Sequence, residues 1–315
     1  MYEKLLQLDD IRINFSAAGM HVINIVLAFV MFGVALGIKP VLFKEVLSKP
    51  KSVVIGLFSQ IVALPAFTFL LIILLNDYLS PMVAMGMILV AACPGGNISN
   101  FMSQLSKANT ELSVTLTAFT TLFSTLLTPA NFAIWGGLYV NFVNQGAGSA
   151  LRELHIDIFQ MFETVFLLLG VPLVLGMLVA HYLPRVAAKL KKPMQYLSII
   201  FFIVMVVLAF GNNFDLFIHH IGFIFILVLM HNGLALGTGF SLATVFKLPE
   251  PDRRTLTIET GIQNSGLGLV LLFNPKIFPP DLAIGGMLFV TAWWGIWHII
   301  SGLTVSALFA RSKKI

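Results

Sequence analysis

Charged residues are scarce in this sequence: Asp, Glu, Lys and Arg make up only 10% of its 315 residues, whereas soluble domains contain about a quarter. Hydrophobic residues make up 58%. This balance excludes an ordinary soluble protein, and apolar runs of about 20 residues recur from end to end. We therefore predict an all-α polytopic membrane protein. The basic residues behind the net charge of +5 lie in short loops, so no nucleic-acid partner is expected.

Cysteine is nearly absent as well. Cys93 is the single cysteine, which excludes an internal disulfide. No histidine pair has the spacing of a zinc site such as H-E-x-x-H, and His231 and His298 are expected to make hydrogen bonds between helices. Acidic residues precede the first apolar run and no small-residue cleavage site follows it, so no signal peptide is predicted.

Nine apolar spans are predicted, each long enough to cross a bilayer. They cover residues about 20–38, 52–75, 81–106, 110–136, 157–183, 194–212, 220–246, 254–273 and 281–308. Residues 1–19 are expected to form an extramembrane segment, 20–308 one transmembrane domain, and 309–315 a cytoplasmic tail. A polar loop at about 141–156 divides the chain into two halves.

Two of these spans are interrupted. The first contains A-C-P-G-G-N-I-S-N at 92–100, and the second contains E-T-G-I-Q-N-S-G at 259–266. Proline removes a helix donor, and glycine lowers the cost of leaving helical geometry. Irregular backbone at membrane depth must face protein or a water-filled cavity. Two interrupted helices at corresponding places in two halves are typical of a transporter's binding site.

The distribution of Lys and Arg sets the orientation of the spans. With nine spans, fifteen of the nineteen Lys and Arg residues fall on one side of the membrane. By the positive-inside rule, the N-terminus lies outside the cell and the C-terminus in the cytoplasm, in a multi-pass protein of the cell membrane. The spans within 52–136 and those within 220–308 then run in opposite directions, with the broken span in the middle of each. This layout predicts an inverted repeat whose two discontinuous helices cross near the midplane.

Glu259 is the residue that most strongly indicates a functional site. Acidic residues inside membrane spans are costly and are presumed functional. Gln263 lies four residues further on the same helical face, next to loosened backbone carbonyls. Oxygen ligands of this kind suit a hard cation such as Na⁺. The alternative is an ion pair between Glu259 and Arg253 or Arg254 near the interface.

A second set of oxygen-bearing side chains lies on the span at 110–136. The set consists of Ser113, Thr117, Ser124 and Thr128, with Thr120 and Thr121 between them. Together with Ser99 and Asn100 of the first break, this stripe favours a cation site. The alternative is that these hydroxyls bond to carbonyls of their own helix. Gln60 is either a further ligand or a polar contact between helices.

The breaks also create two new helix N-termini, near Asn97 and near Asn264. Unpaired N–H groups at such ends carry partial positive charge and suit an anion. No Lys or Arg is predicted inside the membrane to bind that anion instead. The same crossing therefore offers oxygens to a cation and N–H groups to an anion.

These motifs closely resemble those of the bile acid:sodium symporter family. The matching stretches are C-P-G-G-N-x-S-N at 93–100, L-S-V at 112–114, H-N-G at 231–233 and E-T-G-I-Q-N at 259–264, with F-G at 32–33 and K-P at 39–40. The resemblance runs from about residue 19 to 309. It implies a core domain (about 52–136 and 220–308) packed against a panel domain (about 20–38 and 157–212), with two bound sodium ions.

The resemblance also implies residue roles. One sodium site would be formed by Ser99, Asn100, Ser113, Thr117 and Glu259. The other would be formed by Gln60, Glu259 and Gln263, with the backbone of Thr260 and Ile262. The substrate would be met at the two helix starts by Asn97, Ile98, Asn264 and Ser265.

We thus expect a sodium-coupled secondary active symporter that imports an organic anion, bile acid-like or a small carboxylate, by alternating access. Its expected partners are that anion, sodium ions and membrane lipids, with no obligatory protein partner. One alternative is proton coupling through Glu259. Another is an intramembrane enzyme that uses Glu259 as acid or base, but no second acidic residue or metal-ligand cluster accompanies it at the breaks, so no enzyme is predicted.

Overall fold

The computed structural model describes residues 2–10, 17–38, 50–145, 158–211, 214–274, 276–279 and 282–312. In that part of the chain the structure is helical, without a strand. An isolated antiparallel bridge joins Gly95 to Gln263, the middle residues of the two predicted breaks. The predicted all-α class is confirmed.

The helices follow one another along the chain in two groups. The first contains α1 (Tyr2–Asp9), α2 (Ala17–Ala35), α4 (Pro50–Phe58), the π-helical turn η1 (Ser59–Ala63), α5 (Leu64–Leu74), η2 (Asn76–Tyr78), α6 (Pro81–Ala92), α7 (Ile98–Leu105) and α8 (Thr110–Gln145). The second contains α9 (Ile158–Val165), η3 (Phe166–Gly170), α10 (Val171–Tyr182), α11 (Pro184–Gly211), α12 (Phe214–Val245), α13 (Glu250–Gly261), α14 (Ser265–Leu272) and α15 (Gly285–Arg311).

The structure corrects some predicted boundaries. Helix α11 begins at Pro184 rather than near 194, so Arg185, Lys189 and Lys191 lie on its first turns instead of in a loop. Hydropathy marks where a chain enters an apolar environment, whereas Lys and Arg are good helix formers and extend the helix beyond it. Helix α8 likewise continues to Gln145, so the polar connection predicted from 141 starts later.

Four helical stretches in the described part of the chain are long and apolar enough to span a membrane. They are Pro50–Leu74, Thr110–Val143, Ile221–Val245 and Gly285–Arg311. Pro81–Ala92 and Val171–Tyr182 are shorter apolar helices. Several such helices in one chain make this a multi-pass membrane protein.

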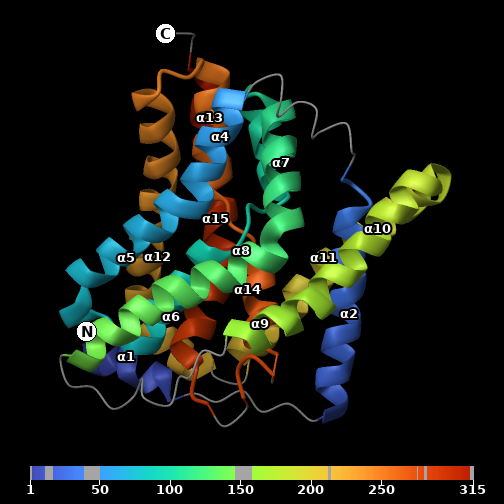
Figure 1. Ribbon diagram of the computed structural model, residues 1–315. Helices are drawn as coiled ribbons and strands as arrows, with labels where there is room; N and C mark the ends of the chain where they lie inside the picture. Colours follow the sequence, from blue (N-terminus) through green and yellow to red (C-terminus); the bar gives the residue numbers. More distant parts are fainter. Residues whose placement is uncertain are drawn as a thin grey trace.

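The helices pack in two groups, which can be followed in Figure 1. Helix α2 packs against α10 and α11 on one side of the molecule. In the other group, α6 packs against α15, α12 against α13, and α14 against α15. Close approach depends on glycine: a Cβ added to Gly86 would lie 2.7 Å from Cα of Met287, so α6 and α15 touch through their backbones.

Helix α1 covers one end of the packed group that contains α6 and α15. Leu5 and Leu8 are completely buried against α6 and α15. The Asp9 carboxylate accepts a hydrogen bond from the Ser80 hydroxyl at 2.8 Å and one from the Met82 N–H at 3.0 Å. A buried carboxylate therefore caps the first turn of α6. The position of segment 1–19 outside the bilayer stays a prediction.

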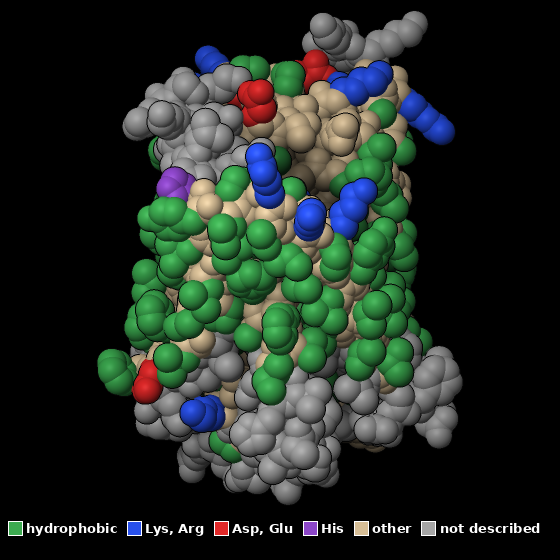
Figure 2. Space-filling view, turned by 90° about the vertical axis from the view of Figure 1, so that its right-hand side faces the viewer, with side chains coloured by type: hydrophobic (Ala, Val, Ile, Leu, Met, Phe, Trp, Pro, Cys, Tyr) green, Lys and Arg blue, Asp and Glu red, His purple; other side chains and the backbone are tan. Residues whose placement is uncertain are grey.

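The side of the molecule that carries α2 and α10 is mostly apolar. Figure 2 shows hydrophobic side chains around its middle and Lys and Arg side chains gathered towards its upper end. On α11, Ile199, Ile200 and Ile203 are each at least half exposed. Such a surface suits contact with lipid tails bounded by a charged interface.

Candidate functional site

The two broken helices meet at their breaks and bond to each other. Helix α6 ends at Ala92 and α7 begins at Ile98, while α13 ends at Gly261 and α14 begins at Ser265. The Gly96 N–H donates to the Ile262 carbonyl and the Asn264 N–H donates to the Pro94 carbonyl, both at 2.8 Å. Each break thus satisfies backbone groups of the other, as the interior of a membrane requires.

The residue types in the first break explain its shape. Pro94 has no N–H to continue α6, and Cys93 before it is extended, with ψ at 154°. Gly95 leaves room for two functional side chains. A Cβ added there would lie 3.1 Å from both Gln60 Oε1 and Glu259 Oε2. Because Gly95 has no side chain, the Gln60 amide on η1 and the Glu259 carboxylate on α13 can both approach the first break.

Glu259 is fully buried at this crossing and surrounded by hydroxyl groups. The Ser99 hydroxyl donates to its Oε1 at 2.5 Å, and the Ser113 hydroxyl donates to the same oxygen. The Thr117 hydroxyl donates to Oε2 at 3.0 Å and to Oε1 at 3.2 Å. Ser113 also donates to Asn100 Oδ1 at 2.9 Å. All five residues expected around the first sodium position are therefore in mutual contact.

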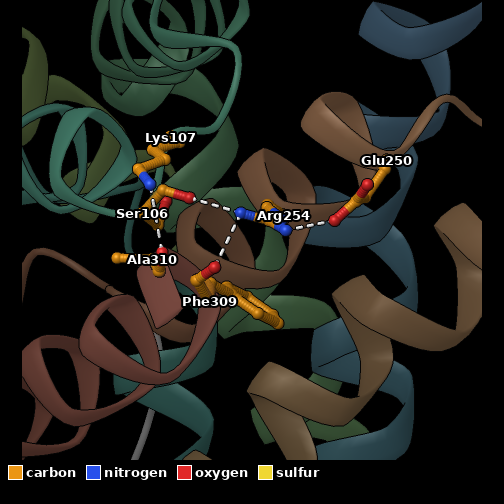
Figure 3. Close-up of polar contacts among 6 residues, drawn as sticks. All are labelled: Ser106, Lys107, Glu250, Arg254, Phe309 and Ala310. Atoms are coloured by element: carbon orange, nitrogen blue, oxygen red, sulfur yellow. Dashed lines mark hydrogen bonds and ion pairs between the residues drawn. The ribbon is translucent and has the colours of Figure 1, made fainter. Parts of the chain in front are cut away.

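The alternative of an ion pair between Glu259 and the nearby arginines is wrong. Figure 3 shows Arg254 between Glu250 on one side and Ser106 and Phe309, at the ends of α7 and α15, on the other. Its Nη1 donates to the carbonyls of Ser106 and Phe309, both at 2.8 Å, and its Nη2 pairs with Glu250. Arginine here binds the C-terminal carbonyls of two helices, whose dipoles favour a cation.

Several further bonds hold the same end of the site together. The Asp252 carboxylate accepts from the Ser52 hydroxyl at 2.5 Å and from the Asn109 amide at 2.7 Å. The Lys107 ammonium donates to the Ala310 carbonyl at 3.2 Å. These contacts join α4, α13, α15 and the turn between α7 and α8, so these elements are fixed to one another near the start of α13, the helix that carries Glu259.

The residues expected around the second sodium position lie beside Gly95 and Gly96. Gln60 and Gln263 are buried, and neither side-chain atom of Gln60 nor Oε1 of Gln263 has a hydrogen-bond partner within the described residues. Gln263 Nε2 donates to the Thr260 carbonyl at 2.8 Å. The Ile262 carbonyl, bonded to Gly96, keeps a second lone pair. Buried amide oxygens without partners need a donor or a cation.

The hydroxyl stripe on α8 divides between its two predicted roles. Ser113 and Thr117 point to Glu259, whereas Thr120 donates to the Leu116 carbonyl at 2.9 Å and Ser124 to the Thr121 carbonyl at 2.7 Å. Bonding within the helix thus describes Thr120 and Ser124 but not Ser113 and Thr117, and the Thr128 hydroxyl has no partner within the described residues.

The predicted substrate residues stand at the starts of the two half-helices. Asn97 precedes α7, is exposed, and makes no capping bond with its side chain. Ile98 is half-buried beside it. Asn264 caps α14 by accepting from the Leu267 N–H at 3.1 Å, and Ser265 is buried. Asn97 is therefore the member of this set whose amide is most open to a ligand.

Asn232 is a residue of the site to which the sequence analysis gave no role. Its amide donates to the Gly261 carbonyl at 2.8 Å, at the end of α13, and accepts from the Ser301 hydroxyl at 2.6 Å. An amide inside an apolar span was the available signal. The neighbouring His231 bonds to the Thr68 hydroxyl at 2.8 Å, which confirms the expected contact between helices.

The chemistry of the crossing fits a small monovalent cation. One buried carboxylate lies among neutral oxygens of hydroxyl, amide and carbonyl groups, and an isolated buried charge is costly unless it is paired. Within the described residues, no three His, Cys, Asp or Glu side chains are grouped as a metal site. The donor set therefore matches the oxygen ligands of Na⁺ and not the nitrogen and sulfur ligands of zinc.

This architecture defines a membrane transporter, because interrupted helices crossing over a buried charge are how such proteins build their sites. The family model described as Sodium Bile acid symporter family matches residues 24–220, and the chain belongs to that family. It is 31% identical to the uncharacterized sodium-dependent transporter YocS of Bacillus subtilis (strain 168) over 93% of this chain and 84% of the relative.

Two further relatives carry cotransporter names. The probable sodium/metabolite cotransporter BASS2, chloroplastic, of Oryza sativa subsp. japonica is 27% identical over 85% of this chain and 62% of its own length. The sodium/bile acid cotransporter 5 of Rattus norvegicus is 26% identical over 84% of this chain and 58% of its own length. These relatives support sodium-coupled transport and make the chain a transporter rather than an enzyme.

Proposed function

We propose that this protein is a sodium-coupled symporter that imports an organic anion, with sodium bound around Glu259. The observation that carries the proposal is a fully buried carboxylate that receives three hydroxyl groups and has no basic side chain among its bonded partners in the described residues. Such a group needs a countercharge, and the surrounding oxygens suit Na⁺.

Two cation positions follow from the placement of the donors. In the first, Ser99, Asn100, Ser113 and Thr117 would turn hydroxyl and amide oxygens from Glu259 towards the ion, since a hydroxyl both donates and accepts. In the second, Gln60 and Gln263 would supply their unpartnered amide oxygens, with the Thr260 and Ile262 carbonyls. Glu259 lies between the two positions and would serve both.

The anion would bind at the N-termini of α7 and α14. Asn97 and Ile98 begin one half-helix, Asn264 and Ser265 the other, and both dipoles present positive ends there. A bile acid-like molecule or a small carboxylate would satisfy this requirement. With the N-terminus outside and the C-terminus in the cytoplasm, two Na⁺ and one monovalent anion carry net positive charge inward, which a membrane potential assists by roughly 2.3 kcal/mol per 100 mV.

Alternating access would move the panel, formed by α2, α9, η3, α10 and α11, against the core, formed by α4 to α8 and α12 to α15. The panel helices pack mainly against one another, whereas the crossing lies entirely within α4 to α8 and α12 to α15. The bonds of Arg254 and Asp252 support movement of the core as one body, because they tie its elements together beside the site.

The direct test is the effect of sodium on purified wild-type and Glu259→Gln protein. Sodium chloride, compared with choline chloride at constant pH, should raise the thermal unfolding temperature of the wild type and leave that of Glu259→Gln unchanged. Thr257→Val is the matched control, since Thr257 lies on α13 and bonds only to the Arg253 carbonyl of its own helix. It should keep the sodium response.

Transport then separates sodium coupling from proton coupling. Proteoliposomes with an imposed sodium gradient should accumulate a labelled anion, tested with taurocholate and with pyruvate as representatives of the two substrate classes. Accumulation of either anion that requires a pH gradient and is indifferent to sodium would overturn the proposal in favour of a proton-coupled transporter.

A further inference from the structure

A small hollow with several polar side chains in its walls lies next to the crossing, against Pro94. It contains about 240 Å³ of space not filled by atoms, part of it open to the outside, between η1, the end of α6 and the middle of α8. Its walls include Gln60, Cys93, Pro94 and, along α8, Thr120, Ser124, Thr128 and Asn131. The α8 residues recur at intervals of four, four and three, so they form one face of that helix.

The hollow contains polar groups that no described residue satisfies. Gln60 is 3% exposed and Thr128 is 1% exposed. Neither the two amide atoms of Gln60 nor the Thr128 hydroxyl has a hydrogen-bond partner within the described residues. Two side chains of this kind, on different helices and bordering the same space, indicate that water or an ion occupies it.

The electrostatics of the hollow favour a cation. Ala92, Cys93 and Pro94, the last residues before the first break, form part of its wall. They lie at the C-terminus of α6, a twelve-residue helix, so the negative end of its dipole faces the space. Among the residues that line it there is no Lys, Arg or His. Its polar side chains are neutral amides and hydroxyls, whose oxygens bind small cations.

Both buried and partly exposed residues line the hollow. Gln60, Thr120 and Ser124 are buried, whereas Ile61 and Asn131 are partly exposed. From Thr120 to Asn131 the axis of α8 advances roughly 16 Å away from Thr117 and the carboxylate. The hollow therefore connects the partly exposed part of α8 with the Gln60 side of the crossing.

We propose that this hollow is a separate path by which sodium reaches the site, distinct from the route of the organic anion. The path would be hydrated and would pass the hydroxyls of Thr128, Ser124 and Thr120 before reaching Gln60. Its lining has no basic side chain and lies at the negative end of α6, so an organic anion would approach the helix starts at Asn97 and Asn264 instead. This inference rests on the proposed sodium site.

Cys93 provides a native probe of the path, because it is the only cysteine in the chain and its residue lines the hollow. Ag⁺ is a small monovalent cation that blocks thiols. Wild-type protein in nitrate buffers is treated with Ag⁺ for increasing times, quenched, denatured, and assayed for remaining free thiol. Ag⁺ should block Cys93 in the native protein, and more slowly in sodium nitrate than in choline nitrate. The bulkier (2-trimethylammonium)ethyl methanethiosulfonate should react far more slowly.

Two variants test the α8 wall. Thr128→Val removes a hydroxyl while keeping the shape, and Ser124→Ala does so at a second position should the first variant fold poorly. Each should slow the Ag⁺ reaction by about fivefold or more, as expected for loss of one polar contact along the path. Thr121→Val is the matched control, since Thr121 is equally buried on α8 but does not line the hollow, and it should react like the wild type. Cys93→Ser sets the background.

The outcomes are separable from those of the sodium site itself. Two results would overturn the path and leave the proposed function standing, provided that sodium stabilises the wild type. In one, Cys93 of the native protein resists Ag⁺. In the other, Cys93 reacts at a rate that neither sodium nor the two variants change. A wild type without any sodium stabilisation would overturn the proposed function first. Slower reaction in sodium and in both variants, with Thr121→Val unaffected, would support the path.

Discussion

Helix α1 makes the stability of the protein dependent on pH through one carboxylate. Burial raises the pKa of Asp9 from 3.8 to about 7, against the opposing effects of hydrogen bonds from the Met82 N–H and the Ser80 hydroxyl. The nearby charge of Asp10 raises it further. The folded protein therefore holds this proton at pH values where the unfolded chain has released it.

The sign of the effect follows from this order of pKa values. Protonation stabilises the folded state fully below about pH 4, and this contribution is lost as the pH rises to about 7. A difference of about three pKa units corresponds to roughly 4 kcal/mol of unfolding free energy. Asp9→Asn cannot ionise, and its amide oxygen can still accept from the Met82 N–H. The variant should be more stable than the wild type at pH 8 and nearly equal to it at pH 4.

Thermal unfolding in detergent, followed by the fluorescence of the four tryptophans, measures this difference at each pH. Other groups titrate over the same range, so the informative quantity is the unfolding temperature of Asp9→Asn minus that of the wild type. Asp10→Asn is the control, because Asp10 is exposed and one residue away, and its difference should vary much less with pH. A difference for Asp9→Asn that stays flat between pH 4 and 8, or falls, would refute the reasoning.

Two further predictions concern packing and the bonded end of the core. Gly239→Ala would place a Cβ 2.8 Å from the backbone carbon of Leu256 and should lower the free energy of unfolding by about 2 kcal/mol. In the control Gly237→Ala, the added Cβ meets nothing within 4 Å, so this variant should raise the free energy of unfolding by up to about 1 kcal/mol. Equal unfolding temperatures of the two variants would contradict the close contact between α12 and α13. Arg254→Met leaves two helix-end carbonyls without their donor and should lower the free energy of unfolding by about 2 to 4 kcal/mol. The control Arg253→Met should lower it little. Similar losses of stability in the two variants would show that the bonds of Arg254 are unimportant.

The sequence was sufficient to predict the crossing because its signals are local. Pro94 followed by two glycines, and Gly261 after Glu259, break their helices whatever surrounds them. A carboxylate inside an apolar span also has few roles available to it, so Glu259 could be assigned to a site before any contact was known. The family membership confirmed by comparison was likewise carried by these two motifs.

What could not be predicted depends on contacts between distant segments. Ser113 and Thr120 have similar sequence surroundings on α8, yet one bonds to Glu259, 146 residues away, and the other to its own helix. The docking of α1 through Asp9 depends on a partner more than 70 residues along the chain. Hydropathy contains no information about which face of a helix meets which neighbour, so these outcomes required the packed structure.

The two breaks depend on each other, and this dependence connects the ion site to the anion site. The Gly96 N–H and the Asn264 N–H have their acceptors in the opposite break, so straightening either helix would leave a buried donor of the other unpaired. Gly96 and Asn264 lie at the starts of the half-helices, and the Ile262 carbonyl that holds Gly96 belongs to the proposed sodium ligands. A cation that binds the Ile262 carbonyl therefore also holds Gly96, one residue before Asn97 at the start of α7, where the anion is proposed to bind. By linkage, an anion bound there must tighten sodium by the same factor. If the sodium affinity did not change when the transported anion bound, these two bonds would have to leave the ion site and the anion site uncoupled. Because both bonds join the same two breaks, we expect the two affinities to depend on each other.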